Sequence, residues 1–179
     1  MDFDNVPGIT LNANLEKYKG LSYGTPEIFL EASSKGFQRL SAFFAYVNGQ
    51  SIEITFQSNK KIDGRYVKDM GFPNKQELFK FAKGKPYENR DECRALYSRL
   101  WDEYIQRQKD LQDVLRNVTG IGDLFGRPGS VCQATELWRI RHGLLSLKMD
   151  ENSLNPVSHQ ISQTNARKRV DESVQMSLF

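Results

Sequence analysis

The sequence predicts an α+β protein, with a small sheet and four or five packed helices in a single domain. Segments with strand-like composition lie toward the amino-terminal side, and segments with helical spacing of apolar residues occupy most of the remainder. A chain of 179 residues with 39% hydrophobic and 26% charged residues is long enough for one domain with a core, and short for two. We therefore expect one domain with appendages.

Two strands are predicted before residue 50. Residues 27–32 (EIFLEA) follow a Gly-Thr-Pro turn and have the β-branched and aromatic content of a strand. Residues 37–47 form the second predicted strand, whose apolar end suits a buried position. It ends at Asn48-Gly49, a dipeptide that favours the positive φ angles of a tight turn.

The segment that follows this turn has two interpretations. In residues 50–58 apolar and polar residues alternate, as they do in the return strand of a hairpin. Ser51 is equally able to cap a helix that runs to about residue 60. The local pattern favours the strand.

Four later segments predict helices: residues 75–83, 90–108, 109–118 and 131–148. The apolar residues of 90–108 keep strict three-and-four spacing, and its charged residues, including Asp102, take the opposite face. We therefore expect this helix to pack one face on the core.

A glycine-rich connection, residues 119–130 (TGIGDLFGRPGS), separates the last two helices and predicts a loop. The chain has two cysteines, Cys93 and Cys132, each inside a segment with helical spacing. This number is too small for a disulfide framework or a cysteine-based zinc site, so we interpret both as small core residues. His142 and His159 are likewise too few and too far apart for a metal site.

Charge and hydropathy limit the class of protein. No apolar run approaches the length of a membrane span, so no membrane association is expected. Asp2 and Asp4 lie where a secretory signal would carry basic residues, which predicts a cytoplasmic protein. A net charge of +3 permits a phosphate-bearing partner but is far from that of a dedicated DNA-binding domain.

The composition changes near residue 150, where Ser, Asn and Gln replace large apolar residues. This change predicts a domain over residues 1–149 and a flexible tail over 150–179. The tail ends in QMSLF, which resembles the pentapeptide that binds the bacterial sliding clamp. In such a peptide Leu178 and Phe179 fill an apolar pocket while Gln175 hydrogen-bonds beside it. The alternative is that Leu178 and Phe179 fold back onto the domain.

Residues 51–60 (SIEITFQSNK) match the pattern Ser/Thr, Val/Ile, Glu, two variable residues, Phe/Tyr, Gln, two variable residues, Lys. This pattern, preceded by LSAFF at 40–44 and by Asn-Gly-Gln at 48–50, resembles the hallmark of the NADAR family of N-glycosidases. Family members carry a tryptophan after an Arg-Asp pair, whereas Glu92 follows that pair here. The resemblance covers roughly residues 27–142 and implies that 51–60 is helical.

Cleavage of an N-glycosidic bond needs a proton for the departing nitrogen and stabilisation of positive charge at C1′. On a helix Glu53, Gln57 and Lys60 lie at i, i+4 and i+7 and share one face. Glu53 is then the candidate acid and base, and Gln57 orients hydroxyls or a base edge. Lys60 contacts a phosphate or attacks C1′ to form a Schiff base. The alternative is that Glu53, Gln57 and Lys60 simply form the solvent-exposed face of the helix.

Further substrate-binding candidates surround this motif. Ser41 and Phe43 belong to the LSAFF segment, where Ser41 either contacts a phosphate or caps a turn. Arg65 and Asp69 follow the motif and are able to clamp a pyrophosphate or ribose hydroxyls. Asp123 follows Gly-Ile-Gly, where backbone amides are placed to face a phosphate or a plain turn forms.

The resemblance implies a cofactor-independent hydrolase that removes ADP-ribose from a nucleobase, with guanine in DNA as the expected base. A clamp-binding tail would deliver such an enzyme to DNA. The family resemblance also allows a hydrolase of ribosylaminopyrimidine phosphate intermediates of riboflavin synthesis. A third hypothesis is a non-catalytic nucleotide-binding accessory protein of a phage or plasmid.

Overall fold

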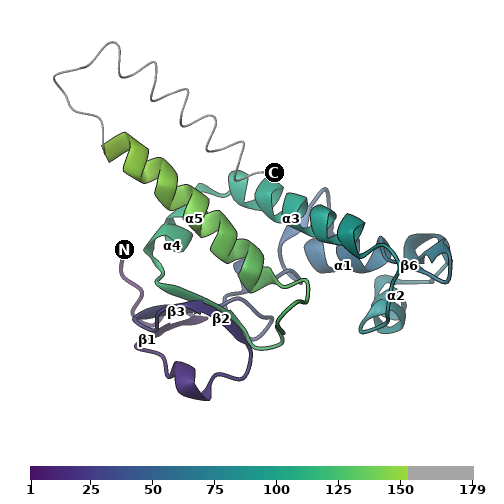
Figure 1. The fold of residues 1–179 in the computed structure, drawn as a ribbon, viewed down its shortest axis with the longest axis horizontal. Helices are drawn as coiled ribbons and strands as arrows, with labels where there is room; N and C mark the ends of the chain where they lie inside the picture. The colour runs from purple at the N-terminus through teal and green to yellow at the C-terminus, as the bar shows by residue number, and fades with distance from the viewer. Residues whose placement is uncertain (153–179) are drawn as a thin grey trace, which may run out of the picture.

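A four-stranded mixed sheet forms one end of the molecule (Figure 1). The computed structural model describes residues 1–152, with side chains to residue 147. The strand order is β1-β3-β8-β2. The bounds are Ile9–Leu11 for β1, Leu21–Gly24 for β2, Ile28–Glu31 for β3 and Gly120–Asp123 for β8.

The central pair of this sheet is parallel. Strand β3 runs parallel to β8 with Leu30 opposite Ile121, and β2 is antiparallel to β8. Because β3 and β8 point the same way, their carboxyl-terminal residues, Glu31 and Asp123, lie at one edge of the sheet. This edge faces the region that carries the predicted site residues.

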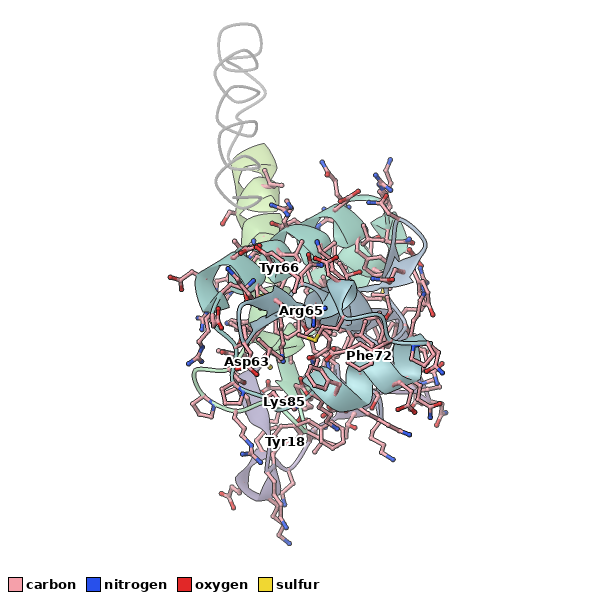
Figure 2. The ribbon with its side chains drawn as sticks, turned by 90° about the vertical axis from the view of Figure 1, so that its right-hand side faces the viewer. Tyr18, Asp63, Arg65, Tyr66, Phe72 and Lys85 are labelled. Atoms are coloured by element: carbon pink, nitrogen blue, oxygen red, sulfur yellow. The ribbon has the colours of Figure 1, made fainter. Side chains whose placement is uncertain are left out.

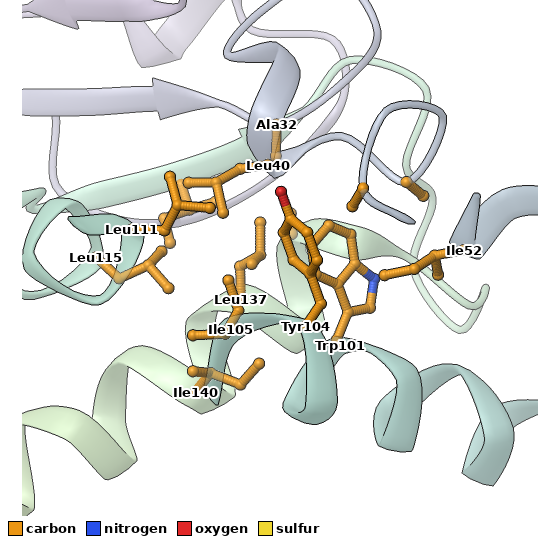
Figure 3. Packing of buried hydrophobic residues seen from close by; sticks show 14 of the residues in the cluster. Ala32, Leu40, Ile52, Trp101, Tyr104, Ile105, Leu111, Leu115, Leu137 and Ile140 are labelled. Carbon is orange, nitrogen blue, oxygen red and sulfur yellow. The ribbon is translucent and has the colours of Figure 1, made fainter. Parts of the chain in front are cut away.

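Three helices build the core with the sheet: α3 (Arg90–Gln106), α4 (Lys109–Asn117) and α5 (Gln133–Asn152). Helix α5 packs on β8 and β2, and α3 and α4 pack against α5 (Figure 1). Buried leucines and aromatic rings fill the space between them. Figure 3 shows Leu40, Trp101, Leu111, Leu115 and Leu137 in this cluster. None of the helices described through residue 152 is long and apolar enough to cross a membrane.

A second group of elements lies beside the core and carries the motif. It contains the hairpin β4 (Tyr46–Val47) and β5 (Gln50–Ser51), helix α1 (Ile52–Ser58), the hairpin β6 (Lys61–Ile62) and β7 (Arg65–Tyr66), and helix α2 (Lys75–Ala82). Short 3-10 turns complete the chain: η1 (Leu15–Lys17), η2 (Gln38–Leu40) and η3 (Val67–Asp69). Helix α1 joins the two groups, because it contacts both α2 and α3.

The strand prediction for residues 50–58 is wrong, and the alternative helix is correct. Ser51 Oγ accepts a hydrogen bond from the Ile54 amide at 3.2 Å and caps α1. Ile52 and Phe56, four residues apart, are both buried on the core side of the helix. Packing against α3 therefore overrides the local alternation.

The long strand predicted at residues 37–47 is also largely wrong. Only Tyr46–Val47 pairs as a strand, and the preceding residues form η2 and a turn. The Ser41 carbonyl accepts hydrogen bonds from the amides of Phe44 and Ala45, at 3.0 and 2.9 Å, and closes this turn. The Asn48-Gly49 turn is confirmed, with φ angles of 52° and 78°.

The glycine-rich segment 119–130 begins with the buried central strand β8, not with a loop. A β-carbon on Gly120 would lie 2.3 Å from the Thr25 carbonyl oxygen, so the close strand approach requires glycine there. Strands β1 and β2 were not predicted, because three or four residues carry too little pattern. Strand β3 confirms the prediction for residues 27–32.

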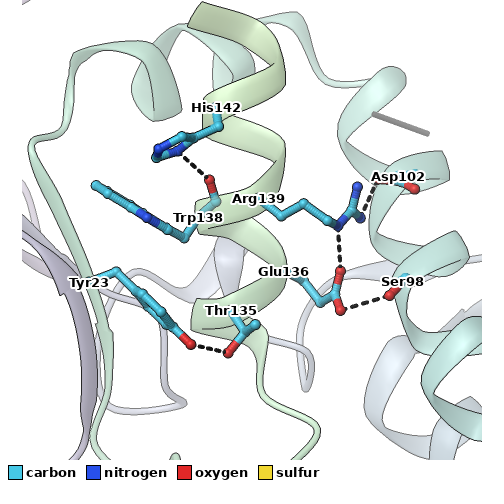
Figure 4. A network of polar contacts seen from close by, with 8 residues as sticks. All are labelled: Tyr23, Ser98, Asp102, Thr135, Glu136, Trp138, Arg139 and His142. Atoms are coloured by element: carbon cyan, nitrogen blue, oxygen red, sulfur yellow. Dashed lines mark hydrogen bonds and ion pairs between the residues drawn. The ribbon is translucent and has the colours of Figure 1, made fainter. Parts of the chain in front are cut away.

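The four predicted helices are present as α2, α3, α4 and α5, and both cysteines are buried. Asp102, expected on the solvent face of α3, is instead buried and accepts a hydrogen bond from Arg139 at 2.6 Å. Arg139 also donates to Glu136, which accepts from Ser98 (Figure 4). This network of charged side chains joins α5 to α3. Helix periodicity alone had assigned Asp102 to solvent.

Candidate functional site

The amino-terminal end of α1 places Glu53 beside Gln57. The Glu53 amide donates to the Ala42 carbonyl at 2.9 Å, which fixes the start of the helix against the preceding turn. One helical turn later, Gln57 Nε2 donates to Glu53 Oε1 at 2.8 Å. Glu53 is half-buried and Gln57 is buried, so the pair belongs to an interior site and not to a solvated helix face.

The environment of Glu53 favours its protonated form. Burial raises the pKa of Glu53, and the carboxylate of Asp123 raises it further. The hydrogen bond from Gln57 and the charges of Lys60 and Lys83 oppose this rise without cancelling it. A carboxyl group that keeps its proton to higher pH is suited to act as a general acid.

Lys60 lies two residues beyond the end of α1, not on the helix as predicted. Its side chain is nevertheless buried, with 4% of its surface exposed. Nζ donates to the Ala82 carbonyl at 3.3 Å and lies 5.1 Å and 4.7 Å from the ring centroids of Phe56 and Tyr87. The amine is held by one carbonyl and two aromatic faces.

Burial lowers the pKa of Lys60, whereas the charge of Glu53 opposes that change. Glu53 and Lys60 are therefore close enough to influence each other's ionisation. They form no ion pair in the part of the chain with described side chains. A desolvated amine with a lowered pKa is more often neutral, which is the nucleophilic form.

A cavity of about 470 Å³ opens beside Lys60. It lies between α1, the link from α2 to α3, and the loop before α5. Lys85 and Arg90 line it together with Lys60, and the rings of Phe56 and Tyr87 form part of its wall. Three cations and two rings around one cavity suit an anionic ligand with a flat or apolar part.

Asp123 lies at the end of β8 and is buried. Gln133 Nε2 donates to Asp123 Oδ2 at 3.1 Å, and the Phe125 amide donates to Oδ1 at 3.0 Å. Gln133 Oε1 in turn accepts from the Ala42 amide at 2.6 Å. Because the Ala42 carbonyl accepts from Glu53, a continuous chain of hydrogen bonds joins the two carboxyl-bearing residues.

Two buried polar atoms in this region have no hydrogen-bond partner within the described structure. They are Ser41 Oγ and Gln57 Oε1. Burial of such groups without partners costs free energy, and a bound ligand would recover it. Gln57 was predicted to contact the substrate and Ser41 either to contact a phosphate or to cap a turn; both stay predictions, and Trp101 Nε1 in the core is a third buried atom without a partner in the described residues.

The other predicted residues lie at the surface. Phe43 is 38% exposed, and its ring centroid is 5.5 Å from that of Phe79. Arg65, labelled in Figure 2, donates through Nη2 to the Asp69 backbone carbonyl at 3.4 Å. Both side chains are exposed. Arg65 and Asp69 therefore contact each other within the β7–η3 segment, and no contact between them and Glu53 is seen in the described residues.

Sequence reasoning missed two residues that shape the site, Gln133 and Tyr97. Gln133 carries no motif, and only its position at the start of an apolar helix hints that its amide faces inward. Tyr97 was expected in the core and is buried there, but its pKa is raised by burial and then by the charges of Glu53 and Asp123. Its ring centroid lies 5.3 Å from that of Phe56 on α1.

No protein-family model, curated protein or solved structure matches this chain. Within the described residues, no group of three or more His, Cys, Asp or Glu side chains is placed to hold a metal ion. The predicted clamp-binding residues Gln175, Leu178 and Phe179 lie outside the described part of the chain. The geometry of α1 and its surroundings therefore carries the functional argument.

The raised pKa of Glu53 predicts how Glu53→Gln changes stability with pH. Ionisation of the buried carboxyl opposes folding, so its contribution is favourable below the unfolded pKa and is lost as pH rises through the folded pKa. We expect Glu53→Gln to raise the melting temperature relative to wild type at pH 8, and this advantage to shrink toward pH 4. Thermal melts across this pH range test it, with the exposed Glu16→Gln as control. A pH-independent difference would contradict the burial of the charge.

Proposed function

We propose that the protein is an N-glycosidase that breaks the bond between a nucleobase and ribose C1′, and that it removes ADP-ribose from guanine in DNA. The observation that supports this proposal is that residues 53–60 place a desolvated carboxyl and a buried amine on one short segment, with pKa values shifted in opposite directions. Glu53 has a raised pKa, and Lys60, which lines the cavity, has a lowered one. Each shift is in the direction that favours a proton donor at Glu53 and a neutral amine at Lys60.

In the proposed reaction, the Lys60 amine attacks C1′ while Glu53 gives its proton to the departing base nitrogen. The C1′–base bond breaks and a C1′–Nζ bond forms, so the base leaves neutral and the sugar remains on the lysine as an N-glycoside. Nζ then returns a proton to Glu53, which passes it to the ring oxygen O4′ as the C1′–O4′ bond breaks, and the opened sugar is held on the lysine as a Schiff base. Glu53, now a carboxylate, activates water. Addition of water to the imine releases the sugar, restores the amine and returns the proton.

The choice of DNA as the substrate rests on the chain's two resemblances. The NADAR-like motif at residues 51–60 supports cleavage of N-glycosidic bonds to a phosphate-bearing ribose. The QMSLF end supports delivery to DNA through a bacterial sliding clamp, in the cytoplasm. A scavenger of small riboflavin intermediates has no evident use for such a peptide.

We expect Glu53→Gln to lower turnover at least about a hundredfold, because the variant lacks the positioned proton. Release of ADP-ribose from modified single-stranded DNA is the measurement, with ribosylaminopyrimidine phosphate assayed in parallel. Glu16→Gln is the control, since it removes an exposed carboxyl that is distant from Glu53 in the sequence.

Wild-type turnover by the Glu53→Gln variant would contradict the assignment of the acid. Cleavage of the aminopyrimidine phosphate alone would replace the DNA substrate with the riboflavin intermediate. If the wild-type protein cleaves neither substrate, the result would contradict the glycosidase proposal and favour the non-catalytic nucleotide-binding protein.

We expect borohydride, added during turnover, to trap a sugar adduct on Lys60. Reduction converts the imine to a stable amine, which peptide mass spectrometry locates. Lys60→Ala removes the adduct, whereas Lys61→Ala, at the neighbouring position, retains it. An adduct on another residue, or turnover without any adduct, would show direct hydrolysis by water.

Deletion of residues 175–179 tests the proposed role of the tail. Leu178 and Phe179 supply the apolar surface that a clamp pocket would bury, so the truncated protein should lose binding to a purified bacterial sliding clamp. Its activity on a short oligonucleotide should stay unchanged, because a tether alters local concentration and not chemistry. Calorimetry with no binding by the full chain, or unfolding of the truncated protein, would contradict this role.

A further inference from the structure

Beside Glu53 the surface carries two aromatic rings and a lysine, Phe43, Phe79 and Lys83, which we call the Phe43 platform. The Phe43 and Phe79 rings meet edge to face, with centroids 5.5 Å apart and an interplanar angle of 72°. Lys83 Nζ lies 5.4 Å from the Phe79 centroid. The platform combines an exposed aromatic face with an adjacent cation.

Exposure of Phe43 is not a consequence of a disordered segment. The turn that presents it is closed by hydrogen bonds from Phe44 and Ala45 to the Ser41 carbonyl, and Ala42 is anchored through Gln133 and Glu53. Phe43 is nevertheless 38% exposed. A rigid turn that holds a large ring partly in solvent is a surface prepared for a ligand.

The charge around the platform is strongly positive. Residues 75–85 contain four lysines, all exposed, against one acidic residue, Glu77. Glu77 pairs with Lys80 at 3.4 Å, so the segment keeps a net charge of +3, as large as that of the whole chain. Lys85 lies on the face that Figure 2 presents, and also lines the cavity beside Lys60.

The platform is continuous with the proposed catalytic site. Phe43 directly follows Ala42, whose carbonyl accepts from the Glu53 amide at 2.9 Å. Helix α1, which carries Glu53, packs against α2, which carries Phe79. A ligand resting on Phe43 would therefore extend toward Glu53.

We propose that the Phe43 platform binds single-stranded nucleic acid, with an unpaired base stacked on the exposed face of Phe43, which Phe79 supports edge to face, and the backbone phosphates held by Lys83 and the neighbouring lysines. Exposed rings interleaved with lysines are the physical requirement for this ligand, because every base has a face that stacks and every nucleotide carries a phosphate. An apolar peptide would cover the lysines without supplying acidic partners. Base and phosphate together satisfy both parts of the surface.

This inference deepens the proposed function, since it assigns the residues that would hold a polynucleotide next to Glu53. It does not depend on bond cleavage, because an unmodified strand has the same bases and phosphates. Binding and catalysis are therefore measured on different ligands.

The test is fluorescence anisotropy of the full-length protein with a fluorescein-labelled, unmodified oligodeoxythymidine, and with the matching RNA as a second arm. We expect Phe43→Leu to weaken binding about tenfold, because leucine keeps the apolar contact but loses stacking. Phe43→Tyr should bind like wild type. Phe44→Leu, in the same turn and 46% exposed, is the matched control and should change affinity less than twofold.

Lys83→Ala should weaken binding and reduce the slope of log affinity against log salt by about 0.7, the release of one counterion from a single strand. Lys17→Ala, exposed on η1, should leave the slope unchanged. Thermal melts confirm that each variant is folded.

Three results would overturn the inference: no oligonucleotide binding by the wild-type protein, equal losses for Phe44→Leu and Phe43→Leu, or a concentration-dependent dimer that Phe43→Leu abolishes. Binding that depends on Phe43, together with no cleavage of any ADP-ribosylated strand, would support the platform and refute the glycosidase. Cleavage of an ADP-ribosylated strand, together with unchanged binding by Phe43→Leu, would support the glycosidase and refute the platform.

Discussion

The arrangement of the site depends on two hydrogen bonds made by the side chain of Gln133. It accepts from the Ala42 amide at 2.6 Å and donates to Asp123 at 3.1 Å, so one amide group joins the turn before α1 to the end of β8. Both contacts are buried, where hydrogen bonds are stronger and their loss is more costly. Without this bridge the sheet edge and α1 would have only apolar packing to set their distance.

Burial gives the two reactive groups their chemical character. The same desolvation that raises the pKa of Glu53 lowers that of Lys60, because in each case the charged form loses its water. An acid that keeps its proton and an amine that lacks one are the forms that the proposed reaction needs. The buried oxygens of Ser41 and Gln57, which have no hydrogen-bond partner in the described residues, also cost stability. Such costs are expected at functional sites.

In the proposed function, the site and the surface beside it have two different tasks. The buried part offers ionisable groups and a cavity, and the Phe43 platform offers exposed rings and lysines to a longer ligand. Ala42 and Phe43 are consecutive, so the turn that orients Glu53 also presents the aromatic face. Recognition and chemistry are thereby placed within a few residues of each other.

The sequence by itself determined the α+β class, the later helices and the Asn48-Gly49 turn, because these depend on local periodicity and turn chemistry. Only the tertiary structure decided that residues 52–58 are helical, that Gly120–Asp123 is a central strand and that Asp102 is buried. Each of these depends on partners distant in the chain. Lys60 shows the same limit: its spacing placed it near Glu53, but Ala82 and Tyr87, more than twenty residues later, hold its amine in place.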